Sequence, residues 1–319
     1  MIIESHHELL AQVASMYYER EMTQNAIAAD LGLSRVKIYR LLKQARAEQV
    51  VQITVNWPTK RDTALESALE QTFGLDKALV LNTTSRADVA TLQRLGQLGA
   101  AYLEGILADG STMAVCLGRT SFETIQAISP VFQAKVRVAQ AVGSMPFAMQ
   151  ELDSATLARD LAQKLGGDVL YLTSPLMGDT VQASRVIRNQ RDIQRTLAVA
   201  REANVALTGV GNLDPTISGF SQGGFISAEE LRMFTAAGAV GDMAGQIYTV
   251  NGQLYPCEYN ERVIGITLKD LKQIPTTVAV ALGREKGRAI LGGLRTGAIN
   301  VLCTDGEAAH RTLQLNSQS

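Results

Sequence analysis

The segment Gly118-Arg119-Thr120-Ser121 combines one glycine, one cation and two hydroxyls directly after the apolar run at 112–117. We predict a helix over 120–129, which places these residues at a helix N-terminus. Backbone N–H groups are unpaired at such an end and bind anions, and an arginine there adds charge-assisted hydrogen bonds. A phosphate group is the natural ligand of this combination.

Three further glycine-containing turns follow apolar runs. They are Gly143-Ser144, the segment TGVGN at 208–212 and the segment GREK at 283–286. Ligands of open α/β sheets bind beyond the carboxyl ends of the strands, where these turns would lie. Lys286 would add a second cation for a phosphate. Each turn also has a purely structural explanation, because glycine turns end strands in all α/β proteins.

Asp242 is a lone carboxylate in the run GAVGD. It either caps the segment from Met243 onward or holds sugar hydroxyls in a ligand site. Nucleotide motifs are disfavoured: GVG at 209–211 is not GxGxxG, and GREKG at 283–287 lacks the Walker A spacing.

Cysteines and histidines restrict the chemistry further. Cys116, Cys257 and Cys303 have no paired spacing, which argues against a metal site or disulfide framework and for a reducing cytoplasm. The histidines are His6, His7 and His310, all near the chain ends, so a histidine general base in the core is excluded. We expect no cofactor.

A second group of functional side chains lies in a basic helix predicted over 35–46. This stretch holds five lysines and arginines and no acidic residue, which suits a helix lying against DNA phosphates. Polar side chains at its start can reach base edges. The residues expected to contact DNA are Gln24, Ser34, Arg35, Lys37, Tyr39 and Arg40.

The basic helix is the second part of a predicted helix-turn-helix. The first helix covers 24–31, and the turn contains Gly32, a residue for which φ > 0 is inexpensive. Ser34 is a good N-cap. The apolar residues that two crossed helices would share are Ile27, Leu31, Leu33, Ile38 and Leu41. An ordinary helical hairpin with a solvated basic face is the alternative.

A helix over 8–21 would brace this motif, and a strand with Val51, Ile53 and Val55 would follow it. Beyond residue 57 the pattern alternates between strands and helices. We predict strands at 78–81, 112–117, 136–142, 168–172, 205–210, 278–282 and 300–303. We predict helices at 62–73, 88–107, 120–129, 151–165, 180–202, 227–236 and 285–295. Nearly continuous apolar strands indicate an α/β fold whose mostly parallel sheet is covered on both faces. Residues 313–319 are polar and expected to fray.

The length of 319 residues accommodates two domains, which we place at 1–57 and 58–319. The net charge is −1, so any affinity for DNA must be local or multiplied by oligomerisation. The first residues carry charges too early for a signal peptide, and the chain has no apolar run of about 18 residues.

The sequence resembles the SorC-type sugar-binding transcriptional regulators over nearly its whole length. The resemblance is strongest at 17–51, at GAVGDMAGQIYTVNGQ (238–253) and at 261–305. It implies a large domain folded like sugar-phosphate isomerases and glucosamine-phosphate deaminase but acting as a sensor. Members of the family bind phosphorylated sugars or their products, usually act as tetramers, and change operator affinity on binding.

By motif, the resemblance assigns the phosphate loop to Gly118, Arg119, Thr120 and Ser121. It implies that Gly143 and Gly211 line the pocket, that Asp242 binds hydroxyls and that Lys286 binds phosphate. Two departures leave the ligand open: Arg119 stands where the family varies, and AVGS has one glycine where relatives often have two.

We therefore predict a cytoplasmic regulator of a carbohydrate catabolic operon, controlled by a phosphorylated sugar or polyol. One alternative is a sugar-phosphate isomerase or deaminase with an attached DNA-binding domain. Another is a DNA-binding protein whose large domain only oligomerises.

Overall fold

The computed structural model describes residues 2–48, 50–51, 58–83, 88–145 and 150–318. The chain forms two compact units, Met1–Asn56 and Trp57–Ser319. Each is described by itself.

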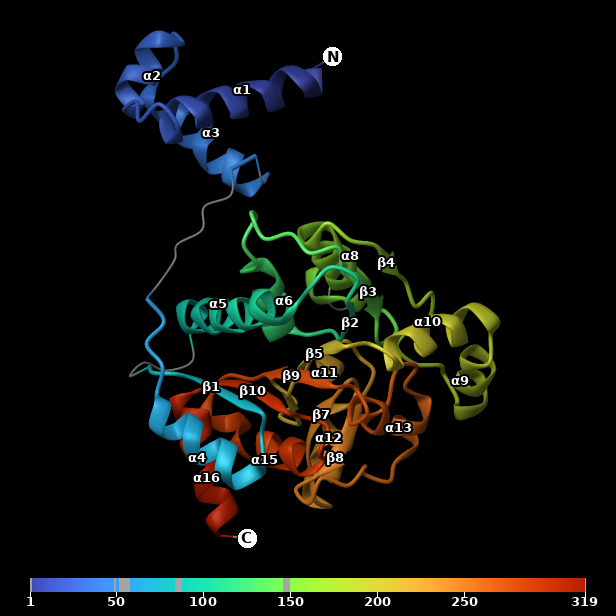
Figure 1. Ribbon diagram of the computed structural model, residues 1–319. Helices are drawn as coiled ribbons and strands as arrows, with labels where there is room; N and C mark the ends of the chain where they lie inside the picture. Colours follow the sequence, from blue (N-terminus) through green and yellow to red (C-terminus); the bar gives the residue numbers. More distant parts are fainter. Residues whose placement is uncertain (1, 49, 52–57, 84–87, 146–149, 319) are drawn as a thin grey trace. The chain divides into compact units, whose positions relative to one another are not determined.

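The described part of the first unit contains three helices, α1 (Ile2–Tyr18), α2 (Gln24–Asp30) and α3 (Arg35–Ala47) (Figure 1). Gly32 takes φ +63° in the turn, as its position predicts. The Ser34 hydroxyl accepts from the Lys37 N–H at 3.2 Å and so caps α3. The core of the unit is formed by Leu10, Val13, Ala14, Met16, Ile27, Ala28, Ile38, Leu41, Leu42 and Ala45. The helix-turn-helix prediction is confirmed. Most of the predicted strand, from residue 52 onward, lies outside the described residues.

The second unit contains a seven-stranded sheet in the order β1-β10-β9-β5-β2-β3-β4. Every neighbouring pair in it is parallel. The strands are β1 (Lys77–Leu81), β2 (Thr112–Val115), β3 (Arg137–Gln140), β4 (Val169–Leu170), β5 (Val205–Gly209), β9 (Thr276–Val280) and β10 (Val301–Asp305). The predicted parallel α/β sheet is confirmed.

Helices cover both faces of this sheet (Figure 1). On one face lie α5 (Val89–Ile106), α6 (Arg119–Gln126) and α8 (Ser154–Leu165). The other face holds α4 (Thr63–Phe73), α10 (Arg191–Arg201), α15 (Gly287–Arg295) and α16 (Gly306–Ser317). Alternate residues of the strands point to opposite faces of the sheet and enter a separate hydrophobic core on each. In β1, Leu79 packs in the core with α5, and Val80 packs in the core with α4.

Shorter elements complete the unit around the ends of the strands. The helical ones are η1 (Gln150–Leu152), α9 (Val181–Arg188), α11 (Gly219–Gln222), α12 (Ala228–Ala236), α13 (Glu258–Arg262), α14 (Leu268–Leu271) and η2 (Arg284–Lys286). A second, antiparallel sheet holds β6 (Gly211–Asn212), β7 (Ala239–Met243) and β8 (Gln246–Thr249).

Two predictions of secondary structure were wrong, and one sheet was missed. The helix over 180–202 is two helices, because Gln190 is extended and the Gln194 side chain donates to the Arg188 carbonyl. The antiparallel sheet was not predicted. Residues 313–317 do not fray: α16 continues to Ser317, since it buries Thr312 and accepts a 2.8 Å hydrogen bond from Arg295 at Asn316.

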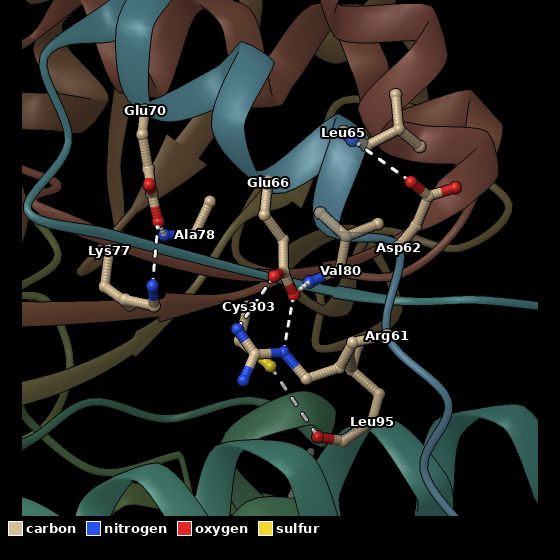
Figure 2. Close-up of polar contacts among 10 residues, drawn as sticks. All are labelled: Arg61, Asp62, Leu65, Glu66, Glu70, Lys77, Ala78, Val80, Leu95 and Cys303. Atoms are coloured by element: carbon tan, nitrogen blue, oxygen red, sulfur yellow. Dashed lines mark hydrogen bonds and ion pairs between the residues drawn. The ribbon is translucent and has the colours of Figure 1, made fainter.

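The free edge of β1 is covered by the residues that open the second unit (Figure 2). Asp62 N–H donates to the Val80 carbonyl at 2.9 Å. The Glu66 carboxylate accepts from the Val80 N–H at 2.9 Å and from the Arg61 Nε at 2.6 Å. Glu70 accepts from the Ala78 N–H at 2.9 Å. Two carboxylates thus pair N–H groups that an edge strand would otherwise leave open.

Candidate functional site

A cavity of about 560 Å³ lies beyond the carboxyl ends of β2, β5 and β9. Four segments supply its functional groups: the start of α6, the turn after β5, strand β7 and the turn η2. Six of the sequence-predicted residues line it, namely Gly118, Arg119, Thr120, Gly211, Asp242 and Lys286. These residues span more than half of the chain, and the parallel sheet brings them together.

The N-terminus of α6 forms one side of the cavity. Gly118 precedes it with φ +130°, a conformation that glycine adopts readily, and offers no side chain to cap the helix. Within the described residues, the N–H groups of Arg119, Thr120 and Ser121 have no acceptor. The unpaired N–H groups and the positive end of the helix dipole form an anion site.

The two hydroxyls of this loop have different surroundings. Thr120 lines the cavity, and its Oγ1 donates to the Val280 carbonyl at 2.7 Å, which fixes α6 to β9. Ser121 does not line the cavity. Its side chain is fully buried, and its hydroxyl has no partner among the described residues. The backbone N–H of Ser121 belongs to the unpaired first turn of α6.

Asp242 supplies a buried carboxylate. It lies within β7, so the capping alternative is wrong. The residue is 8% exposed, lines the cavity, and its carboxylate accepts no hydrogen bond from the described residues. Burial raises the pKa of Asp242 to about 7, and the charge of Lys286 opposes this rise. A carboxyl near its pKa can accept or donate a hydrogen bond, which suits sugar hydroxyls.

Gly211 is required beneath this carboxylate. The two residues are paired in register between β6 and β7. A Cβ on Gly211 would lie 2.0 Å from the Asp242 Oδ1. Any side chain at 211 would therefore displace the acid.

Lys286 is held beside the turn that follows β5. Its Nζ donates to the Val210 carbonyl at 2.7 Å. Burial lowers the pKa of Lys286, whereas the negative charge of Asp242 raises it. Its turn is anchored because Gly283 N–H donates to the Asp305 carboxylate at 2.8 Å.

Gly143 does not line the cavity. Its N–H donates to the Ile264 carbonyl at 2.8 Å, and an added Cβ would lie 2.1 Å from the Pro175 carbonyl oxygen. Residue 143 is glycine because two backbone segments pack against it. A glycine turn that lines a pocket has the same sequence pattern, so the sequence alone does not distinguish the two cases.

Sequence reasoning missed several polar residues of the cavity wall. Asn212 follows Gly211 directly, and Ser218 and Gln222 come from the short helix α11. Phe220 on the same helix also lines the cavity and contacts the ring of Tyr259, with centroids 5.9 Å apart. Of these residues, only Asn212 could have been predicted from the sequence to line the cavity, because it directly follows the glycine turn.

In the first unit, α3 presents the predicted basic face. Arg35, Lys37, Tyr39 and Arg40 are exposed. The hydroxyl of Ser34 accepts the capping hydrogen bond and can still donate one outward. Gln24 is half-buried at the first position of α2.

Comparisons with known proteins address the family. Residues 58–314 match the family described as "Putative sugar-binding domain". The chain is 32% identical over 316 residues to the transcriptional regulator LsrR of Klebsiella pneumoniae, a match that covers 97% of this chain and 94% of that protein. The chain belongs to the SorC-type sugar-binding transcriptional regulators. The resemblance seen in the sequence is confirmed.

Other SorC-type regulators match over similar lengths. The deoxyribonucleoside regulator of Bacillus subtilis is 30% identical over 95% of this chain and 96% of its own length. The full-length sorbitol operon regulator SorC of Klebsiella pneumoniae has the same fold. Its TM-score is 0.72 at 27% identity, with 96% of this chain and 99% of that chain covered.

The described residues of this SorC-type regulator contain neither a membrane-spanning helix nor a cluster of metal ligands. No helix there is long and apolar enough to cross a membrane. No group of three or more histidine, cysteine or acidic side chains is placed to hold a metal ion.

Proposed function

We propose that this protein is a transcription regulator of a carbohydrate catabolic operon, in which the first unit binds operator DNA and the second binds a phosphorylated sugar or polyol. One observation carries the proposal. A single cavity combines a helix N-terminus with unpaired N–H groups, a lysine, and a buried carboxylate without a hydrogen-bond partner in the described residues. An anion at one end of a hydroxylated molecule matches this set.

The ligand would bind with its phosphate at the start of α6. The N–H groups of Arg119 and Thr120 would donate to phosphate oxygens, and the Arg119 guanidinium and Lys286 ammonium would add charge. Asp242 would then accept from sugar hydroxyls. Lys286 would exchange its present hydrogen bond to the Val210 carbonyl for one to the ligand.

A connected set of contacts supports control of the first unit from this cavity. Gly283, in the Lys286 turn, donates to Asp305 at the end of β10. Asp305 is paired in register with Leu81 of β1, and Leu81 forms a bridge with Arg61, which lies five residues after the last residue of the first unit. A ligand that moves the turn would bias the segment joining the units. It can do so only by binding one arrangement more tightly than another.

The remaining parts of the proposal come from the family. Members usually act as tetramers, and a tetramer would multiply the local affinity of one DNA-binding unit for DNA. A protein that binds operator DNA would act in the cytoplasm. We propose no enzymatic activity. Asp242 is the one observation in favour of an isomerase or deaminase, because a buried carboxyl with a pKa of about 7 suits proton transfer.

The test is a thermal-shift panel of sugars and polyols, each with and without phosphate. A ligand at a hundredfold excess over Kd stabilises the folded state by about 2.7 kcal/mol. We expect stabilisation by a phosphorylated member and none by its unphosphorylated twin, and a change in operator affinity with the same compound. If no compound in the panel stabilises the protein, the proposed effector site is refuted. If the protein turns over a sugar phosphate, the isomerase or deaminase hypothesis is favoured over the regulator.

A further inference from the structure

Val36 occupies the centre of the outward face of α3. The buried residues of this helix are Ile38, Leu41, Leu42 and Ala45. At about 100° per residue, Val36 lies about 180° from the middle of that buried stripe. The side chain is 60% exposed. Tyr39, Arg40 and Lys43 follow it at spacings of three, four and seven residues and are exposed on the same face.

No contact among the described residues of the first unit explains a valine there. Ser34 caps the helix, and Val36 does not belong to the core cluster of that unit. A β-branched residue at an exposed helical position lowers helix propensity slightly relative to alanine, lysine or glutamate. An apolar side chain at the centre of a face that is otherwise charged or aromatic therefore indicates a contact with a partner.

The charge of α3 identifies the partner as a DNA duplex. The helix holds five basic residues and no acidic one, so it complements phosphates on both sides of a groove. Val36 has neither donor nor acceptor. In the major groove, the apolar group that a base edge presents is the thymine 5-methyl.

Given the proposed operator binding, on which this inference rests, we propose that Val36 is a specificity-determining residue that reads a thymine 5-methyl group in the major groove. Arg40 and Lys43 hold the helix against the backbone, and Val36 favours an A·T pair at one position of each half-site. Sequence reasoning had selected the polar residues of α3 alone.

The experiment begins with the full chain and a randomised double-stranded DNA pool, from which preferred sequences are enriched at fixed salt. Each thymine of the preferred site is then replaced by deoxyuridine, which keeps every hydrogen-bonding group and removes the methyl. At one thymine of each half-site we expect the wild-type affinity to fall about fourfold, as burial of one methyl group predicts.

The variant Val36→Ala should bind the thymine and deoxyuridine duplexes equally at that position. Alanine is the better helix former, so the variant should remain folded. Val131→Ala is the matched control, because Val131 is a 90% exposed valine in the second unit. It should retain the wild-type preference for thymine.

Three outcomes would overturn the proposal. Wild type could show no thymine that is sensitive to deoxyuridine, Val36→Ala could keep the full preference, or it could lose affinity for all duplexes equally. If the pool yields no preferred sequence at all, operator binding by the first unit is refuted together with the role of Val36. A preferred site without dependence on Val36 refutes the role alone.

Discussion

Replacing Asp242 with asparagine should stabilise the protein at alkaline pH while weakening ligand binding. Burial raises the pKa of Asp242 from its ordinary 3.8 to about 7. Below about pH 4 the carboxyl is protonated in the folded and unfolded states, and the folded state bears no penalty. As the pH rises toward 7, the unfolded chain ionises first, so the free energy of unfolding falls. Above pH 7 the penalty is complete.

The size of the effect follows from these two pKa values. Their difference corresponds to about 4 kcal/mol at about 1.36 kcal/mol for each pH unit. This is an upper limit, because Asp242 also attracts Lys286, and asparagine removes that attraction. About 1.6 kcal/mol of the penalty is already present at pH 5, so between pH 5 and 8 the advantage of Asp242→Asn should grow by at most about 2.7 kcal/mol. The difference in Tm should grow by roughly 4 °C.

The assay is thermal unfolding of wild type and Asp242→Asn at several pH values without ligand. Asp179→Asn is a suitable control because Asp179 is exposed. Its difference from wild type should stay flat over the same range. A difference between Asp242→Asn and wild type that does not change with pH would show that the carboxyl ionises normally in the folded protein, and the description of Asp242 as a destabilised buried carboxyl would be wrong.

Three further substitutions test other contacts. Gly211→Ala would place a Cβ 2.0 Å from the Asp242 carboxylate. It should therefore lower the free energy of unfolding by about 1–3 kcal/mol and weaken ligand binding. Calorimetry with the phosphorylated ligand from the thermal-shift panel measures both effects. Lys286→Ala should weaken binding of that ligand about tenfold or more in titration calorimetry and leave operator affinity without ligand unchanged; equal affinities would remove the lysine from the site. Glu66→Ala leaves the N–H of Val80 and the guanidinium of Arg61 unpaired. Denaturant unfolding should show that the free energy of unfolding falls by about 3 kcal/mol. This value is near the lower limit for a buried pair because Arg61 is 37% exposed. A loss below about 1 kcal/mol would show that solvent replaces the Glu66 contacts.

The first unit was predictable because its signals are local. Gly32 and Ser34 mark the turn and the cap within three residues of each other, and the apolar spacing of α2 and α3 defines a shared core. Strand positions in the large sheet were equally visible, since buried parallel strands are continuous apolar runs. The order of the strands follows from none of these local patterns.

The antiparallel sheet was missed for a physical reason. Strand β7 is the run AVGDM, in which a glycine and an acid interrupt the apolar pattern. It is nevertheless fully buried, because β6, β8 and α15 surround it. Strand β8 follows across the two-residue turn Ala244-Gly245, but β6 and α15 come from segments far along the chain, and alternation in the sequence does not reveal such contacts.

The sequence by itself determined the types of chemistry: a basic recognition helix, a helix N-terminus for an anion, a carboxylate and a lysine. Tertiary structure decided which of these meet. Gly143 and Gly211 follow similar apolar runs, yet one packs against the Pro175 carbonyl and the other lies beneath Asp242. Burial likewise decided that Asp242 has a pKa near 7. Packing and desolvation depend on atoms far away along the chain, and local residue patterns carry no record of them.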